Sequence, residues 1–375
     1  MRVVYLIHSL HRSGGIERVL SLKAGALAAR DGFEVWIVTF RQRGRPPFFP
    51  LDPRVKTLDL GVNDKSPLGG RRLRSRLDAA LERIRPDVTV SLCGRDLYQL
   101  SRLQHAGKRM AEFHFSHSKF HSEYGGTALG RLYAGFRLRR FTRAASLLDC
   151  FVVLTRADRD YWQERLRGVD VRQIYNPLTF QPEQAAALEA HRCIAVGRLE
   201  YQKNFSALVR AWSAVHAQAP DWTLDIFGEG SYRKALERQI AAAGLTGSVH
   251  LRGHSRRIPE ELFSSSCVVM SSWFEGFPMI LLEAASCGVP MVSFDCPHGP
   301  AELIRDGENG YLVRMGDTQA LSQAILRVIG DGGQAALQHR RRLGAEARRT
   351  SEAFTLGRTM DRWEALLHAV AGRRA

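Results

Sequence analysis

Two carboxylates eight residues apart, Glu275 and Glu283, bracket a glycine turn and the start of a short helix. The apolar run Cys267 to Met270 predicts a buried strand, and Pro278 suits a first helical turn. Glu275 is then expected in the loop at the carboxyl end of that strand, and Glu283 about one and a half turns into the helix. Open α/β sheets bind ligands at this edge, so both carboxylates are candidate ligand-binding groups.

Two cations, Arg198 and Lys203, stand five residues apart in a loop that begins at Gly197 and leads into a helix. Both could grip a diphosphate through charge-assisted hydrogen bonds worth about 1.5 to 3 kcal/mol each. Such contacts would hold a leaving group. Two solvated surface charges are the alternative interpretation.

The helix after Pro278 could also bind a nucleotide. Glu283 can accept hydrogen bonds from a ribose diol, and the backbone N–H groups from Gly276 to Leu281 could meet a phosphate. An exposed helix carboxylate is the alternative. The apolar neighbours of Glu283 favour a largely buried helix, in which a carboxylate needs partners.

The first half of the chain offers weaker signals. Gly14 and Gly15 follow the first expected strand, where paired glycines let the backbone approach a phosphate or sugar; a tight turn without a ligand is equally compatible. His114 ends another expected strand and could hydrogen-bond a reacting sugar or transfer a proton. With His117 and His121 it could also suggest zinc, but no completing Cys or His cluster follows.

Asp158 and Asp160 resemble the DxD pair of metal-dependent glycosyl transfer. They open an expected helix, where acidic side chains favour the helix dipole, and we prefer that interpretation. No metal site is therefore predicted.

The elements that must position these residues alternate between short apolar strands and helices, which predicts parallel sheets covered by helices on both faces. Asn176-Pro177 marks the expected hinge between two doubly wound domains. The expected strands are Val3 to Ile7, Val35 to Phe40, Val55 to Leu60, Val88 to Leu92, Arg109 to Phe113, Cys150 to Leu154, Val171 to Tyr175, Cys193 to Val196, Thr223 to Phe227, Val249 to Leu251, Cys267 to Met270, Met291 to Phe294 and Tyr311 to Val313. Helices are expected over 15–31, 70–85, 127–147, 156–166 and 351–370.

Composition supports a folded protein of two domains, since 375 residues exceed one ordinary core and 45% of them are apolar. No segment approaches a membrane span or a signal peptide, so we expect a cytosolic chain. The six cysteines show no CxxC spacing and are expected to be reduced core residues.

The net charge of +16 is concentrated in one half of the chain. Residues 1–176 contain 32 Lys and Arg against 17 Asp and Glu, whereas the remainder contains 22 against 21. The first domain is thus expected to face membrane lipid, a lipid diphosphate or nucleic acid, with a solvated surface as the alternative. Within it, arginines and apolar residues interleave over 131–143, which fits an interfacial helix on anionic lipid or packing on the sheet equally well.

Taken together, these motifs resemble those of the family 4 retaining glycosyltransferases of GT-B fold, in which two Rossmann-like doubly wound domains face a central cleft. The residues that carry the resemblance are Gly14-Gly15-Ile16-Glu17, His114, Gly197-Arg198, Lys203-Asn204, Phe227-Gly228-Glu229-Gly230, Glu275-Gly276-Phe277-Pro278 and Glu283. The segment Asp295 to Ile304 resembles more loosely the variant found in bacterial enzymes of cell-envelope polysaccharide synthesis.

The resemblance implies a metal-independent, retaining hexosyltransferase that uses a UDP-sugar and needs no cofactor. Arg198 and Lys203 would stabilise the departing diphosphate. Glu275 would bind hydroxyls of the donor sugar, Glu283 would hold the ribose, and His114 would orient the sugar. Backbone would complete the donor site at Gly15, Gly228, Arg252, Ile258, Gly276, Phe277, Pro278 and Met279.

The resemblance also implies the partners. We expect a lipid-linked or glycan acceptor bound by an N-terminal domain of residues 1–176, a nucleotide-sugar domain of residues 177–355, and a C-terminal helix over 356–375 that crosses back to the first domain. The chain is expected in the cytoplasm, peripheral at the inner face of the plasma membrane, and not on nucleic acid. The alternatives are another GT-B nucleotide-sugar enzyme, an epimerase or inverting transferase, and a protein that binds an anionic polymer through the basic domain.

Overall fold

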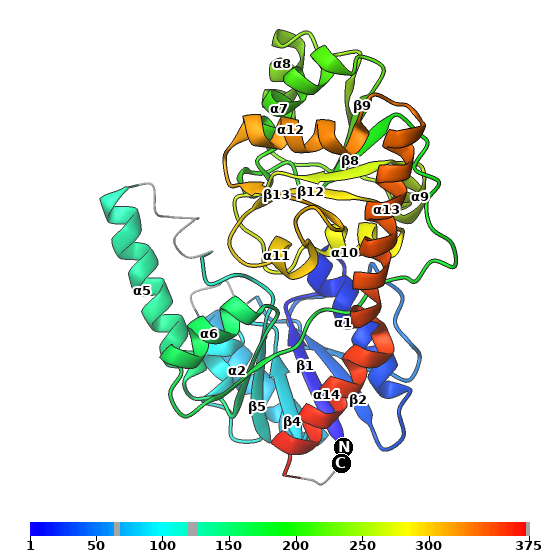
Figure 1. Ribbon diagram of the computed structural model, residues 1–375. Coiled ribbons are helices and arrows are strands. Elements are labelled where there is room, and N and C mark those ends of the chain that lie inside the picture. Colours follow the sequence, from blue (N-terminus) through cyan, green and yellow to red (C-terminus); the bar gives the residue numbers. More distant parts are fainter. Residues whose placement is uncertain (64–67, 119–126, 373–375) are drawn as a thin grey trace. The chain divides into compact units, whose positions relative to one another are not determined.

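The computed structural model describes residues 1–63, 68–118 and 127–372, which form two compact units (Figure 1). The N-terminal unit comprises Met1–Thr179 together with Leu356–Ala375, and the C-terminal unit comprises Phe180–Thr355. The first boundary lies three residues beyond the expected hinge at Asn176-Pro177.

A parallel sheet of seven strands forms the centre of the N-terminal unit, in the order β3-β2-β1-β4-β5-β6-β7. Successive strands extend outward from β1 in two directions, so the chain reverses its winding between β1 and β4. The strands are β1 (Arg2–Ile7), β2 (Glu34–Thr39), β3 (Lys56–Asp59), β4 (Val88–Ser91), β5 (Lys108–Phe113), β6 (Cys150–Val153) and β7 (Asp170–Gln173). The helices are α1 (Gly15–Ala28), α2 (Gly69–Ile84), α3 (Leu97–Leu100), α5 (Ala128–Ala145), α6 (Arg156–Arg165) and α14 (Leu356–Val370).

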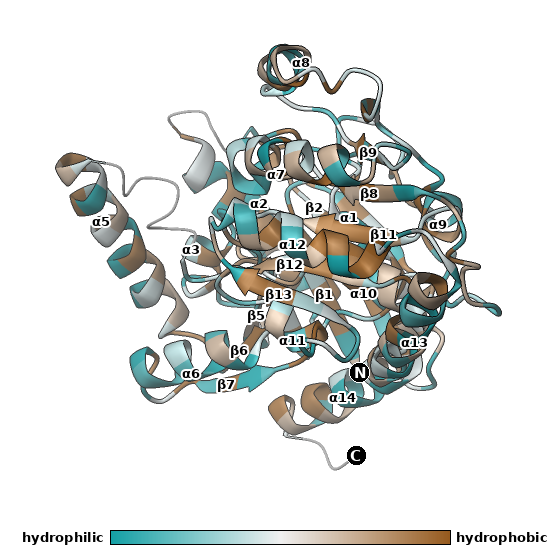
Figure 2. Cartoon of the chain, turned by 45° about the horizontal axis from the view of Figure 1, so that its top comes forward, coloured by the Kyte–Doolittle hydropathy of each residue, from teal (hydrophilic) through white to brown (hydrophobic). Residues whose placement is uncertain are grey.

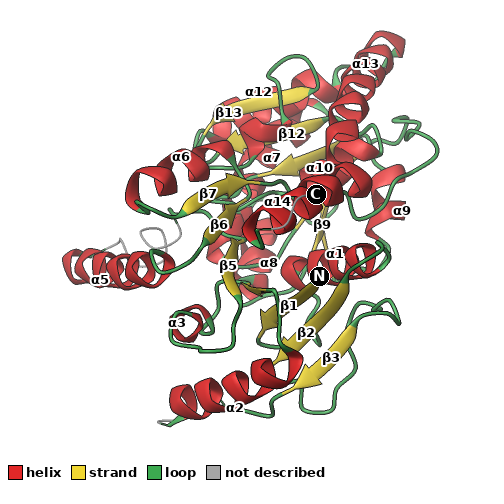
Figure 3. Ribbon diagram, turned by 90° about the horizontal axis from the view of Figure 1, so that it is seen from below, coloured by secondary structure: helices red, strands yellow, loops and turns green. Residues whose placement is uncertain are grey.

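Both faces of this sheet are buried, as expected for apolar strands that are all parallel. One face packs under α2, α5 and α6 around Phe113, Phe151 and Trp162, and the other packs under α1 and α14 around Tyr5 and Met110. Figure 3 shows the strands in yellow with helices on either side. The alternation of residues along β5 therefore decides which helix layer each side chain meets.

The C-terminal unit repeats the topology with six parallel strands in the order β10-β9-β8-β11-β12-β13. Its reversal lies between β8 and β11. The strands are β8 (Arg192–Val196), β9 (Thr223–Phe227), β10 (Val249–Gly253), β11 (Cys267–Met270), β12 (Met291–Asp295) and β13 (Gly310–Arg314). The helical segments are η1 (Tyr201–Lys203), α7 (Phe205–Gln218), α8 (Arg233–Ala242), α9 (Ile258–Phe263), α10 (Met279–Ser286), α11 (Pro300–Leu303), α12 (Thr318–Ile329), α13 (Gln334–Ser351) and η2 (Glu352–Phe354).

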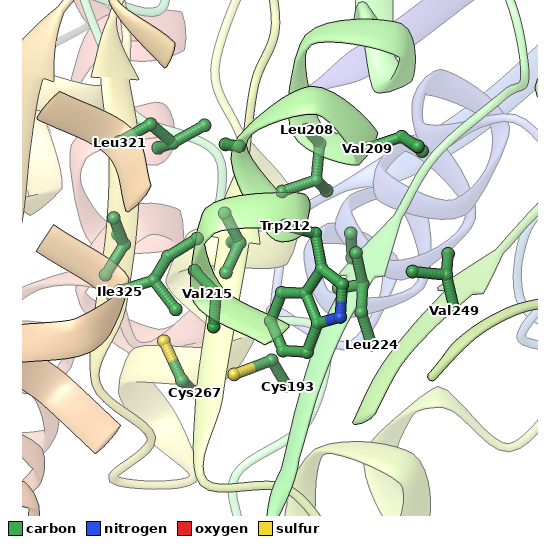
Figure 4. Close-up of a cluster of buried hydrophobic side chains, with 14 of the residues drawn as sticks. Cys193, Leu208, Val209, Trp212, Val215, Leu224, Val249, Cys267, Leu321 and Ile325 are labelled. Atoms are coloured by element: carbon green, nitrogen blue, oxygen red, sulfur yellow. The ribbon is translucent and has the colours of Figure 1, made fainter. Parts of the chain in front are cut away.

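The core of the C-terminal unit is built around Trp212 of α7, which is fully buried. Figure 4 shows its indole among Val215, Leu224 and Cys193. Cys193 and Cys267 are paired neighbours on β8 and β11. All six cysteines are free and five are buried, which agrees with the expected reduced core residues. The prediction of two doubly wound parallel domains is confirmed.

The expected single helix over 351–370 is wrong at its start. Helix α13 ends at Ser351, Thr355 adopts an extended backbone, and α14 begins only at Leu356. Phe354 accordingly packs on Phe277 of the C-terminal unit instead of lining α14. Helix α14 buries Met360, Trp363, Leu366 and Leu367 against the N-terminal unit, to which it belongs.

Helix α5 is packed at one end and exposed at the other. Phe141 is 4% exposed in the core, whereas Leu129 and Leu132 near the start of the helix are 80% and 73% exposed. Figure 2 shows hydrophobic and hydrophilic residues interspersed along α5. Within the described part of the chain, no helix combines the length and the apolar composition required to cross a membrane.

Candidate active site

The strongest cluster of predicted residues lies at the carboxyl ends of β8 and β11, the two strands that flank the reversal of the C-terminal sheet. The loop after β8 supplies Arg198 and Lys203, and the loop after β11 supplies Glu275. Because β8 and β11 are neighbours in the sheet, these two loops meet although Lys203 and Glu275 are 72 residues apart. This is the position at which doubly wound sheets bind ligands.

Lys203 and Glu275 form a partly buried ion pair at this edge. The Nζ atom of Lys203 donates to Oε1 of Glu275 at 2.7 Å, and the two side chains are 17% and 8% exposed. The Ser272 hydroxyl donates to the same carboxylate oxygen at 2.6 Å. Glu275 is therefore held in one orientation by two donors, with its second oxygen, Oε2, outside both contacts.

Glycines explain how the lysine reaches this position. A Cβ atom at Gly197 would lie 2.7 Å from Cε of Lys203, so the lysine stem passes over the site of the missing side chain. A Cβ atom at Gly228 (φ 145) would lie 1.9 Å from the carbonyl oxygen of Gly197. Gly228 was predicted as a donor-binding residue; in this structure it is also required for the close approach of the β8 and β9 ends.

Further hydrogen bonds lock the two loops together. Gln202 donates from Nε2 to the carbonyl of Phe274 at 2.9 Å and accepts from the backbone N–H of Trp273 at 2.9 Å. The Ser271 hydroxyl donates to the carbonyl of Lys203 at 2.9 Å. The Lys203–Glu275 geometry thus rests on a rigid frame, which preorganised binding requires.

Arg198 lies in the same loop but is exposed, and its guanidinium donates to Oε1 of Gln202 at 3.3 Å. A long hydrogen bond at an exposed position leaves the side chain able to turn towards an anion at little energetic cost. The structure therefore brings Arg198 into the region of Lys203 without fixing its head group.

Glu283 lies on α10, where its side chain is buried at 4% exposure among Leu282, Ala284 and other apolar residues. The prediction of a largely buried helix is confirmed. The helix begins at Met279 with Pro278 as its N-cap residue, so the N–H groups at its start lie in the loop that carries Glu275. Gly299 (φ 146) packs on this loop, since its Cβ would lie 2.7 Å from Cδ of Pro278.

Arg252 is the penultimate residue of β10, and its side chain extends to the neighbouring strand β9. Its Nε donates to the buried carboxylate of Asp225 on β9 at 2.8 Å, and Arg192 donates to the other oxygen at 2.7 Å. Burial raises the pKa of Asp225, but these two arginines outweigh it and hold the pKa below its ordinary value. The side chain of Arg252 is thus engaged with Asp225, and Ile258 is the first residue of α9.

In the N-terminal unit, Gly14 is the N-cap residue of α1 and Gly15 is its first residue, so both follow β1 as expected. A Cβ at Gly14 would lie 2.2 Å from the carboxylate of Glu17, whereas a Cβ at Gly15 would meet no described atom within 4 Å. Burial raises the pKa of Glu17, and the charges of Arg12 and His114 oppose that shift. Because α1 follows β1 and His114 follows β5 in the same parallel sheet, Glu17 and His114 both lie at its carboxyl edge.

His114 follows β5, and its Nε2 lies 3.3 Å from Oε1 of Glu112, a residue for which the sequence suggested no role. His117 instead pairs its Nδ1 with Asp158 at 2.9 Å and stacks on Tyr161. Asp158 is fully buried and also bonds Thr155, which caps α6, so it is a structural residue as preferred above. His121 lies outside the described residues.

Sequence reasoning missed several residues that hold the site. Ser272 and Gln202 stand within the quoted segments, and their proximity to the charged residues could have suggested them. Lys23 and Glu112 gave no signal, since a charge in a helix or near a strand end is ordinary.

Comparison with protein families assigns each half of the chain separately. Residues 13–181 match the model described as Glycosyltransferase Family 4, and residues 190–331 match the model described as Glycosyl transferases group 1. The two matches together span most of both units.

Two full-length relatives extend this similarity. The chain is 25% identical to an uncharacterised glycosyltransferase of Haemophilus influenzae, covering 98% of this chain and 99% of that protein. It is 28% identical to the amylovoran biosynthesis glycosyltransferase AmsD of Erwinia amylovora, again covering 98% and 99%.

Among solved structures, the chain is similar to a mutant of Staphylococcus aureus TarM in complex with fondaparinux, α-GlcNAc-glycerol and UDP. The TM-score is 0.79 at 15% identity, with 98% of this chain and 99% of that chain covered. At this identity the likeness establishes the fold.

Proposed function

Because the chain belongs to the GT-B glycosyltransferases, we propose that it transfers a hexose or N-acetylhexosamine from a UDP-sugar, with retention of configuration, in the synthesis of a bacterial surface polysaccharide. The observation that carries the proposal is the Lys203–Glu275 ion pair, held at 2.7 Å where the C-terminal sheet reverses. This edge offers a cation for a diphosphate next to a carboxylate for a sugar.

The chemistry assigned to the site is electrostatic. As the bond to the sugar breaks, negative charge accumulates on the leaving UDP, and Lys203 and Arg198 stabilise it. Glu275, fixed by Ser272, accepts hydrogen bonds from sugar hydroxyls, while Glu283 holds the ribose. Backbone groups of Gly276, Phe277 and Met279 meet the phosphate and sugar, and His114 orients the sugar.

A UDP donor is supported by the UDP bound in TarM, and a polysaccharide product by the similarity to the amylovoran enzyme. For the acceptor we propose a lipid-linked sugar or growing glycan presented at the inner face of the plasma membrane. The net charge of +15 in residues 1–176 supports attachment of the N-terminal unit to anionic lipid.

The test is a panel of nucleotide sugars, scored for nucleotide release with and without lipid-linked acceptors. Lys203→Ala and Glu275→Ala are each expected to lower kcat by at least about 100-fold, the usual cost of removing one group that stabilises transition-state charge. Because the site relies on Lys203 and Arg198, we expect transfer to continue in EDTA, and NMR of the product to show a retained anomeric configuration.

Lys234→Ala is the matched control, because Lys234 is an exposed lysine of α8 in the same unit. It should leave turnover unchanged. Near wild-type turnover in a folded Lys203→Ala or Glu275→Ala variant would refute the site, and an inverted product would refute retention.

A further inference from the structure

Beneath His114 lies a carboxylate buried in an apolar layer. Glu112 belongs to β5, inside the seven-stranded sheet, and its side chain is 2% exposed. Residues 110 and 112 point to the same face, on which Met110 and Tyr5 form part of the core under α1 and α14. A lone carboxylate there would be strongly destabilising, so it needs a partner.

Lys23 of α1 is that partner. Its Nζ lies 2.6 Å and 2.7 Å from the two oxygens of Glu112, and its side chain is 1% exposed. Burial raises the pKa of Glu112, but the charge of Lys23 and its hydrogen bonds oppose burial, and the pKa lies below its ordinary value. Glu112 is therefore ionised at neutral pH.

Helix α14 packs against the Lys23 side of this ion pair. The Lys23 ammonium lies 3.6 Å from the ring centroid of Trp363, which is 1% exposed. Arg30, two residues after α1, also forms an ion pair with Asp361 of α14 at 2.6 Å. Helix α14 thus covers Lys23, whose ammonium group contacts Glu112, the carboxylate beside His114.

Stability alone is a poor reason for such a pair. Two ions lose their hydration on burial, and replacing a buried pair with apolar residues of similar volume is often neutral or stabilising. His114 offers another reason, because its Nε2 lies 3.3 Å from Oε1 of Glu112, the oxygen that also accepts from Lys23. The ring nitrogen facing Glu112 is thereby Nε2, which leaves Nδ1 for a ligand.

We propose that Glu112 and Lys23 are positioning residues for the transfer reaction. Glu112 fixes the ring and the tautomer of His114, Lys23 keeps Glu112 charged and in place, and Trp363 makes this arrangement depend on the docking of α14. The inference rests on the proposed function in one respect, namely that His114 meets the donor sugar.

The decisive variant is the double substitution Lys23→Met/Glu112→Leu, which removes both charges at similar volume. Each single substitution leaves a buried charge unpaired and is expected to lower the unfolding temperature. The double variant is expected to recover most of that temperature while its kcat stays about 100-fold low, the cost of a misplaced group at a reacting centre. UDP affinity should be unchanged, because the residues proposed to bind the diphosphate and the ribose lie in the C-terminal unit.

A structural role makes the opposite prediction. If the pair only stabilises the fold, the double variant recovers kcat together with its unfolding temperature, and the proposal is overturned. Tyr5→Phe is the control in the same apolar layer, since the buried Tyr5 hydroxyl has no hydrogen-bond partner among the described residues. Tyr5→Phe should change neither kcat nor the unfolding temperature.

NMR of ¹⁵N-labelled histidine in the ligand-free protein provides a readout independent of activity. Neutral His114 is expected to carry its proton on Nε2 in the wild type and to populate both tautomers in the double variant. An unchanged tautomer in that variant would also overturn the proposal. If the wild type transfers no sugar from any donor, the proposed function fails while this measurement still tests the positioning.

Conservative substitution tests the contribution of α14. Trp363→Phe keeps an aromatic face over Lys23 and is expected to retain kcat, whereas Trp363→Leu removes it and should lower kcat and mix the tautomers of His114. Equal kcat in both variants would contradict the coupling to α14.

Discussion

At the scale of single residues, the glycines of the site loops have different physical origins. Gly228 is required by its neighbours, since any Cβ there would strike the backbone of Gly197. Gly197 is required by a functional side chain, because Lys203 occupies the space that a side chain would fill. Gly15 has neither reason, as a Cβ there meets no described atom within 4 Å and its φ is not positive. Its lack of a side chain is therefore better explained by a ligand that approaches the backbone.

Gly15→Ala tests this interpretation. Alanine at the first position of α1 should leave the free energy of unfolding unchanged or raise it by up to about 1 kcal/mol. If donor phosphate or sugar approaches this backbone, the added methyl costs about 1 to 3 kcal/mol. The value of kcat/KM for the donor then falls roughly 5- to 150-fold, as measured by initial rates.

Gly247→Ala is the matched control, since Gly247 also has no described atom within 4 Å of a Cβ and lies before the start of β10, at the sheet edge opposite to the carboxyl ends of the strands. It should leave kcat/KM unchanged. An unaltered kcat/KM in Gly15→Ala would remove Gly15 from the donor site.

At the scale of elements, α5 has two ends with different environments. Its C-terminal half packs in the core through Phe141 and Ala145. This packing explains the apolar residues in that half of the helix. Its N-terminal half exposes Leu132 and Phe136, at 73% and 61%, together with the exposed Arg131. Apolar side chains next to cations fit an anionic lipid surface, which accepts both.

The double substitution Leu132→Ser/Phe136→Ser is expected to weaken binding to vesicles that contain anionic lipid. Each apolar side chain contributes about 1.5 to 3 kcal/mol when buried, so the loss should exceed roughly tenfold. The unfolding temperature should stay the same because both residues are already exposed. Vesicle co-sedimentation at several salt concentrations measures the binding.

Met315→Ser serves for comparison, since Met315 is 40% exposed in the C-terminal unit. It should not affect vesicle binding. If the α5 variant sediments like the wild type, α5 does not insert into the lipid surface.

At the scale of the whole molecule, the two units differ in charge as well as in assigned chemistry. Residues 1–176 carry a net charge of +15, and the remainder is nearly neutral. Each unit has its own apolar core, so each can respond separately to a ligand. A nucleotide that binds the loops after β8 and β11 should stabilise the C-terminal unit.

UDP at about 100 times its Kd should add about 2.7 kcal/mol to the unfolding free energy of the unit that binds it. Calorimetry should show the shift in the transition of the C-terminal unit, and Lys203→Ala should reduce it because the diphosphate loses a cation. A shift of equal size in Lys203→Ala would place the diphosphate elsewhere.

Much of this molecule could be predicted from local patterns. Alternating apolar strands and helices determined two parallel sheets, because the period of the apolar residues depends on neighbouring positions alone. The same patterns placed Glu275 in a loop and Glu283 on a buried helix. The helix predicted over 351–370 is wrong at its start, since apolar spacing does not reveal that Thr355 is extended.

The pairings at the site depended on the tertiary structure. Lys203 meets Glu275 across 72 residues because β8 and β11 are neighbours, and strand order is not encoded in any local period. Lys23 meets Glu112 across 89 residues because α1 packs on the face to which Glu112 points. The sequence by itself determined which residues carry charge and which elements hold them, while the packing of distant elements decided which charges share a site.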